Sequence, residues 1–433
     1  MKAIIYILFA AVALCGCSTQ RIISENNAEM SDDWRNVFID KPLQALIDTA
    51  LQHNVDVLTV RQNIEQASWQ MRSAGLCYLP SFAFAPSATW QKAQSQPAIK
   101  TYELPLTMQW EMHLGGENKA KKSTAKYLYF SAQQQLVFTR RKLIAEIANA
   151  YYTLLMIDRQ LQLTAESITL QQKTLDAIRE LKDIGKMNEL AVNQAEALLH
   201  ETEASESALK LQQQKTIIAL SLLTGRNFEN VERSDYADAG LINIDTSAVD
   251  LQHLATRPDV LTAEYNLRIA ANNIRAAKSQ FYPTLQINAT GVWTNNLGEI
   301  VNPGKMLLTL VGSLTQPLFQ QGRIKTEYKI AQSQEHQAQT AFSQTLLQAG
   351  CEVAEALSEC RFSSQKIQMR EAQTSSALKA FENSRWLMQY SESVGYLEVL
   401  TAQSTYLNAL IQTSSEVLEE QQSRINLYKA LCQ

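Results

Sequence analysis

The stretch that decides the fold is residues 117–184, which read ENKAKKSTAKYLYFSAQQQLVFTRRKLIAEIANAYYTLLMIDRQLQLTAESITLQQKTLDAIRELKDI. It contains neither proline, which breaks helix interiors, nor glycine, which weakens them. A continuous helix of this length would extend roughly 100 Å at 1.5 Å per residue. The sequence therefore predicts a rod, which no compact globular domain can hold.

The rod carries a seven-residue apolar repeat. Its apolar positions are Leu136, Leu143, Ala150 and Ile157, and between them Ile147, Leu154, Leu161, Ile168 and Leu175. This spacing is typical of a coiled coil that supercoils to the left. The turn at Gly185–Asn188 and a return helix over 187–224 follow. We expect the same plan again later, with helices over 323–390 and 396–431 joined by a turn at Ser391–Gly395.

The chain repeats itself after about 200 residues. Asp56-Val57-Leu58 recurs 203 positions later as Asp259-Val260-Leu261, and the segment 146–150 resembles 352–356 at an offset of 206. Such self-similarity indicates an internal two-fold repeat. We assign a first repeat to 43–225, an equatorial linker to 226–246 and a second repeat to 247–433.

Four short segments alternate between apolar and polar residues, at about 81–91, 101–113, 284–294 and 305–318. Period-2 alternation predicts strands, and the turn-rich links inside each pair predict two hairpins. Strands of this length, with Trp90, Trp110 and Trp293 near their ends as candidate membrane-interface aromatics, suit a transmembrane β-barrel. Two hairpins packed on a soluble core are the alternative.

Four strands cannot close a barrel, and lipid cannot satisfy an open sheet edge. Two chains would give eight strands, whose interior side chains fill, whereas three chains would give twelve strands around a lumen. The predicted fold is therefore a mixed α+β membrane protein. Three chains share a 12-stranded outer-membrane β-barrel, which continues as a long coiled-coil α-helical barrel in the periplasm.

The N-terminus predicts export. Residues 1–16 form a signal peptide, ending in Leu14-Cys15-Gly16-Cys17, which resembles the bacterial lipobox with lipidation at Cys17. Residues 17–42 then form a lipid-anchored N-terminal linker. An ordinary signal peptide with chance cysteines is the alternative.

Several function classes find no support. The net charge of −4 does not support a general nucleic-acid role. The sequence contains no CxxC pair, phosphate loop, nucleophile elbow or HExxH motif. The five histidines are scattered without ligand spacing. We expect no metal site, no cofactor and no enzymatic activity.

Motifs across the mature chain resemble the TolC-like outer membrane efflux proteins, particularly the lipid-anchored factors of RND-type tripartite systems. They are a Trp34, Phe38, Asp40, Leu43 opening pattern, Arg257-Pro258-Asp259-Val260, Tyr282-Pro283-Thr284-Leu285, Gln316-Pro317-Leu318-Phe319 with Gly322, and Tyr396-Leu397-Glu398-Val399-Leu400. The resemblance implies a homotrimeric outer-membrane exit duct in a Gram-negative bacterium, extending into the periplasm. It also implies a periplasmic adaptor (membrane fusion protein) and an inner-membrane pump of RND type as partners.

The resemblance also implies site residues. Glu398 and Thr401 fall where the family has its periplasmic constriction, although an exposed glutamate at a helix start is the plainer interpretation of Glu398. The two helix turns would be the adaptor-contacting tips, or merely tight turns. Their residues are Gly185, Lys186, Met187, Asn188, Ser393, Val394 and Gly395.

Two basic groups follow the strands, at Lys119, Lys122 and Lys126 and at Arg323, Lys325 and Lys329. They could meet phospholipid headgroups at the periplasmic leaflet, or they could be solvated helix faces. The main rival function is a periplasmic coiled-coil scaffold or adaptor lipoprotein. A secreted enzyme with helical arms is the second rival.

Overall fold

The computed structural model describes residues 34–92, 98–227, 231–236, 242, 251–294, 306–390 and 395–431. The expected signal peptide, Cys17, Ser393, Val394 and most of the equatorial linker lie outside these residues. The chain divides into two compact units, one built from residues 1–51, 143–248 and 356–433 and the other from 52–142 and 249–355.

The second of these units holds the strands and the helices that adjoin them. Helix α4 spans Val55–Leu76, the short 3-10 helix η1 spans Leu251–Thr256, and α7 spans Pro258–Ser279. Asn54 caps α4 by accepting hydrogen bonds from the backbone N–H groups of Asp56 and Val57. Pro258 occupies the first turn of α7, where its missing N–H has no intrahelical partner to lose.

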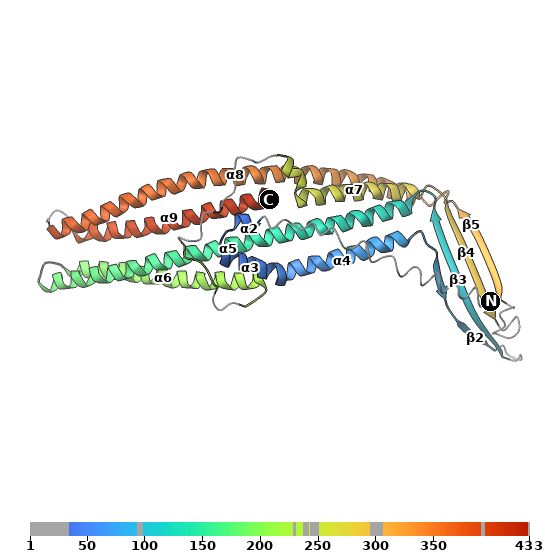
Figure 1. Cartoon of the computed structure of the whole chain (residues 1–433), viewed down its shortest axis with the longest axis horizontal. Helices are drawn as coiled ribbons and strands as arrows, with labels where there is room; N and C mark the ends of the chain where they lie inside the picture. Colours follow the sequence, from blue (N-terminus) through green and yellow to red (C-terminus); the bar gives the residue numbers. More distant parts are fainter. Residues whose placement is uncertain are drawn as a thin grey trace. The chain divides into compact units, whose positions relative to one another are not determined.

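The described residues form one antiparallel sheet of five strands, of which β2 to β5 are labelled in Figure 1. They are β1 (Ser81–Phe84), β2 (Ser87–Gln91), β3 (Ile99–His113), β4 (Thr284–Thr294) and β5 (Leu307–Thr315). Both β1 and β2 pair with β3, which pairs with β4, which pairs with β5. The β3–β4 pairing joins the two predicted hairpins into one surface.

Two strand predictions need correction. The segment 81–91 is not one strand, because it breaks at Ala85 and Pro86, and proline has no N–H to donate to the ladder. The last strand ends at Thr315 and not at residue 318, since Pro317 follows, and Met306 precedes its first paired residue.

The register places like residues on the same face of the sheet. Met108 pairs with Phe82 on one side and with Ala289 on the other, and Ala289 pairs with Leu310. Side chains that face one another across antiparallel strands share a face. One face is therefore apolar apart from Lys100. The other is mostly polar, with Thr107 opposite Thr290 and Thr290 opposite Thr309.

Four long helices account for more than half of the described residues: α5 (Glu117–Asp183), α6 (Glu189–Thr224), α8 (Arg323–Tyr390) and α9 (Tyr396–Leu431). Helix α8 continues through Gly350 without a break. The bounds differ from the predicted ones by one residue at the end of α5 and two at the start of α6. No helix among the described residues is long and apolar enough to cross a membrane.

The first unit buries its core where short N-terminal helices meet α5. Helix α2 spans Trp34–Val37 and α3 spans Lys41–His53. The largest fully buried side chains include Trp34, Phe38, Leu43, Ile47, Ile144, Ile147, Tyr151 and Leu154. The hydroxyl of Tyr151 donates to Asp40 at 2.5 Å and accepts from the N–H of Ser234 at 3.1 Å. Burial and the neighbouring Asp40 carboxylate raise the pKa of Tyr151 well above its usual value.

Candidate functional site: helix tips and a two-faced sheet

The α5–α6 turn is closed by backbone hydrogen bonds around a left-handed glycine. Gly185 has φ +75°, its N–H donates to the carbonyl of Lys182 at 2.9 Å, and the N–H of Lys186 donates to that of Leu181 at 2.9 Å. This arrangement satisfies carbonyls at the end of α5. Asn188 then caps α6 by accepting from the N–H of Ala191 at 3.1 Å. Asn188 is therefore the residue just before α6, and its side chain caps the first turn of that helix.

An apolar cluster supports this turn. It consists of Leu175, Ile178, Ala191, Val192, Ala195, Leu199 and Leu400, with Ile168, Met187, Leu198 and Tyr396 packed against it. The four predicted residues of the turn thus differ in their surroundings. Gly185, Lys186 and Asn188 are exposed, whereas the side chain of Met187 is half-buried against the cluster. Met187 stabilises the turn more than it offers a contact surface.

Ion pairs join α5 to α6 near the turn. Arg179 contacts Glu196 at 2.6 Å, and Lys182 pairs with Glu189. All four side chains are substantially exposed, so solvent screens both pairs and they contribute little to stability.

The first turn of α9 belongs to the same unit and contacts α6. The hydroxyl of Tyr396 donates to Gln194 at 2.7 Å, and Leu400 lies in the apolar cluster. Glu398 and Thr401 are both exposed. The carboxylate of Glu398 lies over Gly395, since a Cβ added to Gly395 would meet it at 2.9 Å. An acidic side chain in this position interacts favourably with the N-terminus of the helix.

The three predicted interface tryptophans lie on the apolar face of the sheet. Trp110 pairs with Ile287 near the helical end, and its indole N–H donates to the carbonyl of Tyr78 at 3.0 Å. Trp293 pairs with Leu104, and Trp90 with Lys100, both toward the opposite end. Trp90 is exposed, while the other two are half-buried. The register thus brings the tryptophans to both ends of one face.

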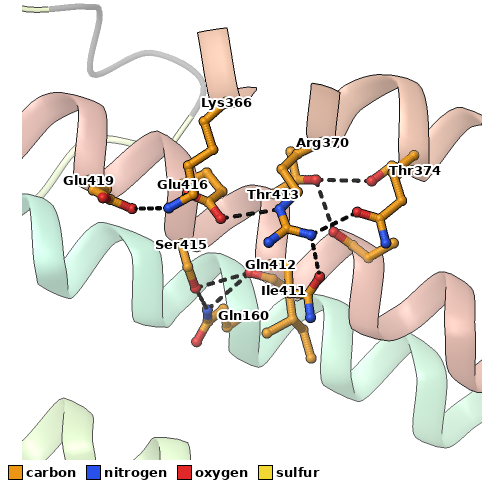
Figure 2. A network of polar contacts seen from close by, with 12 residues as sticks. Gln160, Lys366, Arg370, Thr374, Ile411, Gln412, Thr413, Ser415, Glu416 and Glu419 are labelled. Atoms are coloured by element: carbon orange, nitrogen blue, oxygen red, sulfur yellow. Dashed lines mark hydrogen bonds and ion pairs between the residues drawn. The ribbon is translucent and has the colours of Figure 1, made fainter. Parts of the chain in front are cut away.

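An ion-pair network around the buried Glu416, between α8 and α9 and shown in Figure 2, was not predicted from the sequence. Glu416 contacts Lys366 at 2.6 Å and Arg370 at 3.2 Å, and Lys366 also contacts Glu419 at 2.7 Å. Burial alone would raise the pKa of the Glu416 carboxyl, but these cations hold it below its usual value. Gln160 of α5 donates to Ser415 at 3.0 Å in the same region.

The Arg257-Pro258-Asp259 motif forms a second ion-pair site, around a buried guanidinium. The guanidinium of Arg257 contacts Asp259 and Glu352, each at 2.7 Å, and only 5% of its side chain is exposed. The motif therefore fastens the start of α7 to α8. The motif itself does not predict the contact with Glu352, because that residue lies 95 positions away in the sequence.

Chemistry-bearing clusters are scarce in the described part of the chain. There, no group of three or more histidine, cysteine, aspartate or glutamate side chains could hold a metal ion. Cys77, Cys351 and Cys360 are free thiols. The described residues offer a two-faced sheet, the α5–α6 turn and the exposed first turn of α9.

Comparisons with known proteins agree with this geometry. The sequence profile of the outer membrane efflux protein family matches residues 46–226 and 251–433. The cation efflux system protein CusC of Escherichia coli K12 is 24% identical over 449 residues, covering 97% of each chain. The probable outer membrane lipoprotein SilC of Salmonella typhimurium is 23% identical over 94% of this chain and 88% of its own length.

Solved structures show the same fold. A crystal structure of CusC superimposes with a TM-score of 0.86 at 22% identity, covering 92% of this chain and 94% of that one. The open-state MtrE outer membrane channel of Neisseria gonorrhoeae gives 0.85 at 22% identity, covering 92% and 91%.

The chain therefore belongs to the outer membrane efflux protein family. It is an efflux channel protein of the outer membrane, and its relatives are channels and not enzymes. The scaffold or adaptor interpretation is set aside by this membership.

Proposed function

We propose that three copies of this chain pool their strands into one 12-stranded barrel around a water-filled lumen. Each copy contributes four strand positions, because β1 and β2 pair with successive parts of β3 and together count as one. The observation that carries the proposal is the sheet itself. Within the described residues, β5 pairs only with β4, and β1 and β2 pair only with β3, so both edges present backbone groups without sheet partners. Lipid offers nothing to satisfy such groups. Edge-to-edge pairing of neighbouring copies supplies the missing partners, with the apolar face toward lipid.

The long helices support the same assembly. On α6 an apolar stripe with a seven-residue period is exposed in the single chain, formed by Leu190, Ala197, Ala204, Leu211 and Ile218. A stripe with this spacing is suited to knobs-into-holes packing against another helix. Four long helices per chain would give twelve in the trimer, continuing the lumen into the periplasm. The two separate stretches that the family profile matches support the internal two-fold repeat.

The protein would act as a passive conduit for small molecules, without enzymatic activity. Lipidation of Cys17 would anchor the N-terminus in the outer membrane, consistent with the lipoprotein name of the SilC relative. One lipid-modified residue alone gives only peripheral attachment, so the barrel would provide the main insertion.

The partners are a periplasmic adaptor and an inner-membrane pump of the RND type. The exposed residues of the tips, Gly185, Lys186 and Asn188 in the first turn and Gly395 in the second, would contact the adaptor. Glu398, with Thr401 one turn further, would form a negative ring of three carboxylates at the constriction.

A pair of adjacent cysteine substitutions tests the proposal. Thr309 lies on the polar face of β5 and Leu310 on the apolar face. In a background with Cys77, Cys351, Cys360 and Cys432 replaced by serine and Cys17 kept, a charged, water-soluble thiol reagent should reduce planar-bilayer conductance of Thr309→Cys and leave Leu310→Cys unchanged. Equal labelling of both positions, or no conductance from the unsubstituted protein, would overturn the proposal.

A further inference from the structure

Basic side chains gather in the helix segments that adjoin the sheet. These are residues 70–76 of α4, 117–126 of α5, 272–279 of α7 and 323–330 of α8. The basic belt, as we name it, consists of Arg72, Lys119, Lys121, Lys122, Lys126, Arg275, Lys278, Arg323, Lys325 and Lys329. The same segments contain two acidic residues, Glu117 and Glu327. Their net charge is +8, whereas the whole chain carries −4, so the belt reverses the sign found elsewhere.

Much of this charge is available for binding. The two acids are already paired, Glu117 with Lys121 at 2.7 Å and Glu327 with Arg323 at 3.2 Å. Lys119, Lys122 and Lys325 are exposed and have no ion-pair partner among the described residues. Lys119 and Lys122 lie three residues apart on α5, where side chains are neighbours, so their like charges repel one another. An anionic ligand would relieve that repulsion.

The belt begins where an apolar surface ends. The connections between strands and helices, residues 77–80, 114–116, 280–283 and 316–322, contain no charged residue. They expose large apolar side chains instead: Tyr78, Leu79, Leu114, Phe281, Tyr282, Leu318 and Phe319. From strand to helix, the order is thus an apolar sheet face, exposed aromatic and aliphatic corners, then cations. This order matches the hydrocarbon, interface and headgroup levels of a bilayer.

We propose that the basic belt binds the phosphate groups of anionic phospholipids in the membrane leaflet nearest the helices. The inference rests on the proposed insertion of the sheet in the outer membrane. Each basic residue close to an anionic surface contributes about 1 kcal/mol, which is about fivefold in affinity. A belt repeated in three copies would hold a ring of these lipids and fix the depth of the channel in the bilayer.

The test uses the full-length protein in nanodiscs of phosphatidylcholine with or without phosphatidylglycerol. Lipid retained after re-extraction in detergent is quantified by mass spectrometry. Lys119→Gln/Lys122→Gln/Lys325→Gln is compared with Lys173→Gln/Lys215→Gln/Lys379→Gln, three exposed lysines distant from the sheet in sequence that make the same charge change. A triple arginine variant of the belt lysines keeps the charge.

The unsubstituted protein, the control triple and the arginine triple should all retain phosphatidylglycerol over phosphatidylcholine. The belt glutamine triple should retain it at least about fivefold less. Equal retention in the glutamine triple would overturn the proposal. So would unchanged retention with altered ion selectivity in planar bilayers, because the lysines would then face the lumen. Lipid retention is read without conductance, so a silent channel would count against the proposed function alone.

Discussion

Replacing Arg257 by methionine should destabilise the unit that contains α7 and residues 323–355 of α8. Methionine keeps much of the aliphatic length but removes the guanidinium that contacts Asp259 and Glu352. Removing one partner of a buried ion pair typically costs about 3–5 kcal/mol. Here the two carboxylates are 28% and 58% exposed and can be rehydrated. We therefore expect a loss of about 2 kcal/mol in the free energy of unfolding.

The same substitution should change the dependence of stability on pH. Burial tends to raise the pKa of Asp259, but hydrogen bonds and charge from Arg257 lower it below its ordinary value. A carboxyl with a lowered folded-state pKa stabilises the fold above its unfolded pKa, about 4, and this contribution disappears as the pH falls through the folded value. The difference between the two proteins should therefore be largest at neutral pH and narrow below about pH 4.

Thermal unfolding of the purified protein in detergent measures the effect. For a unit of about 200 residues, 2 kcal/mol corresponds to a Tm lower by about 4–8 °C. Arg268→Met is the control, because Arg268 lies on α7, the helix that Arg257 precedes, and pairs with Glu264 at 2.5 Å while 53% of its side chain is exposed. Its Tm should change little. Equal shifts for the two variants, or a difference that grows in acid, would refute the reasoning.

Three further predictions concern the first unit, which contains α6 and α9. Asn188→Ala should lower the free energy of unfolding by about 1 kcal/mol, since the N–H of Ala191 loses its cap; an unchanged Tm would contradict this. Glu398→Gln should reduce cation selectivity in planar bilayers, whereas Glu371→Gln, also exposed but remote from the turn in sequence, should not; equal behaviour would remove Glu398 from the constriction. Glu416→Gln should lower Tm most at neutral pH and less in acid, because the lowered pKa of Glu416 contributes stability only while the carboxyl is ionised; a pH-independent shift would argue against it.

The long helices could be predicted from the sequence because their signals are local. Helix α5 continues over 117–183 because no proline or glycine interrupts it. It ends at a turn because Gly185 readily adopts a left-handed conformation. The break at Pro86 is also local, but the alternation continues across it, and periodicity alone therefore predicted one strand. A missing N–H outweighs a preserved pattern of side chains.

The buried polar contacts could not be predicted, because they join residues far apart in the chain. Gln160 contacts Ser415, which lies 255 positions later in the chain. Glu416 of α9 contacts Lys366 of the preceding helix, α8. In the sequence, Glu416 looks like any charged residue on a helix surface. Only the packing of α8 against α9 shows that it is buried and paired. The sequence likewise does not show that the side chain of Met187 is half-buried, whereas its neighbours in the α5–α6 turn are exposed.

The mass of the detergent-extracted particle tests the central claim most directly. Native mass spectrometry of the intact protein should show three chains, since three sets of strands are the fewest that give a ring wide enough to hold water. A particle of one chain would leave both sheet edges open, and one of two chains would give eight strands with a filled interior. Either mass would contradict the shared barrel.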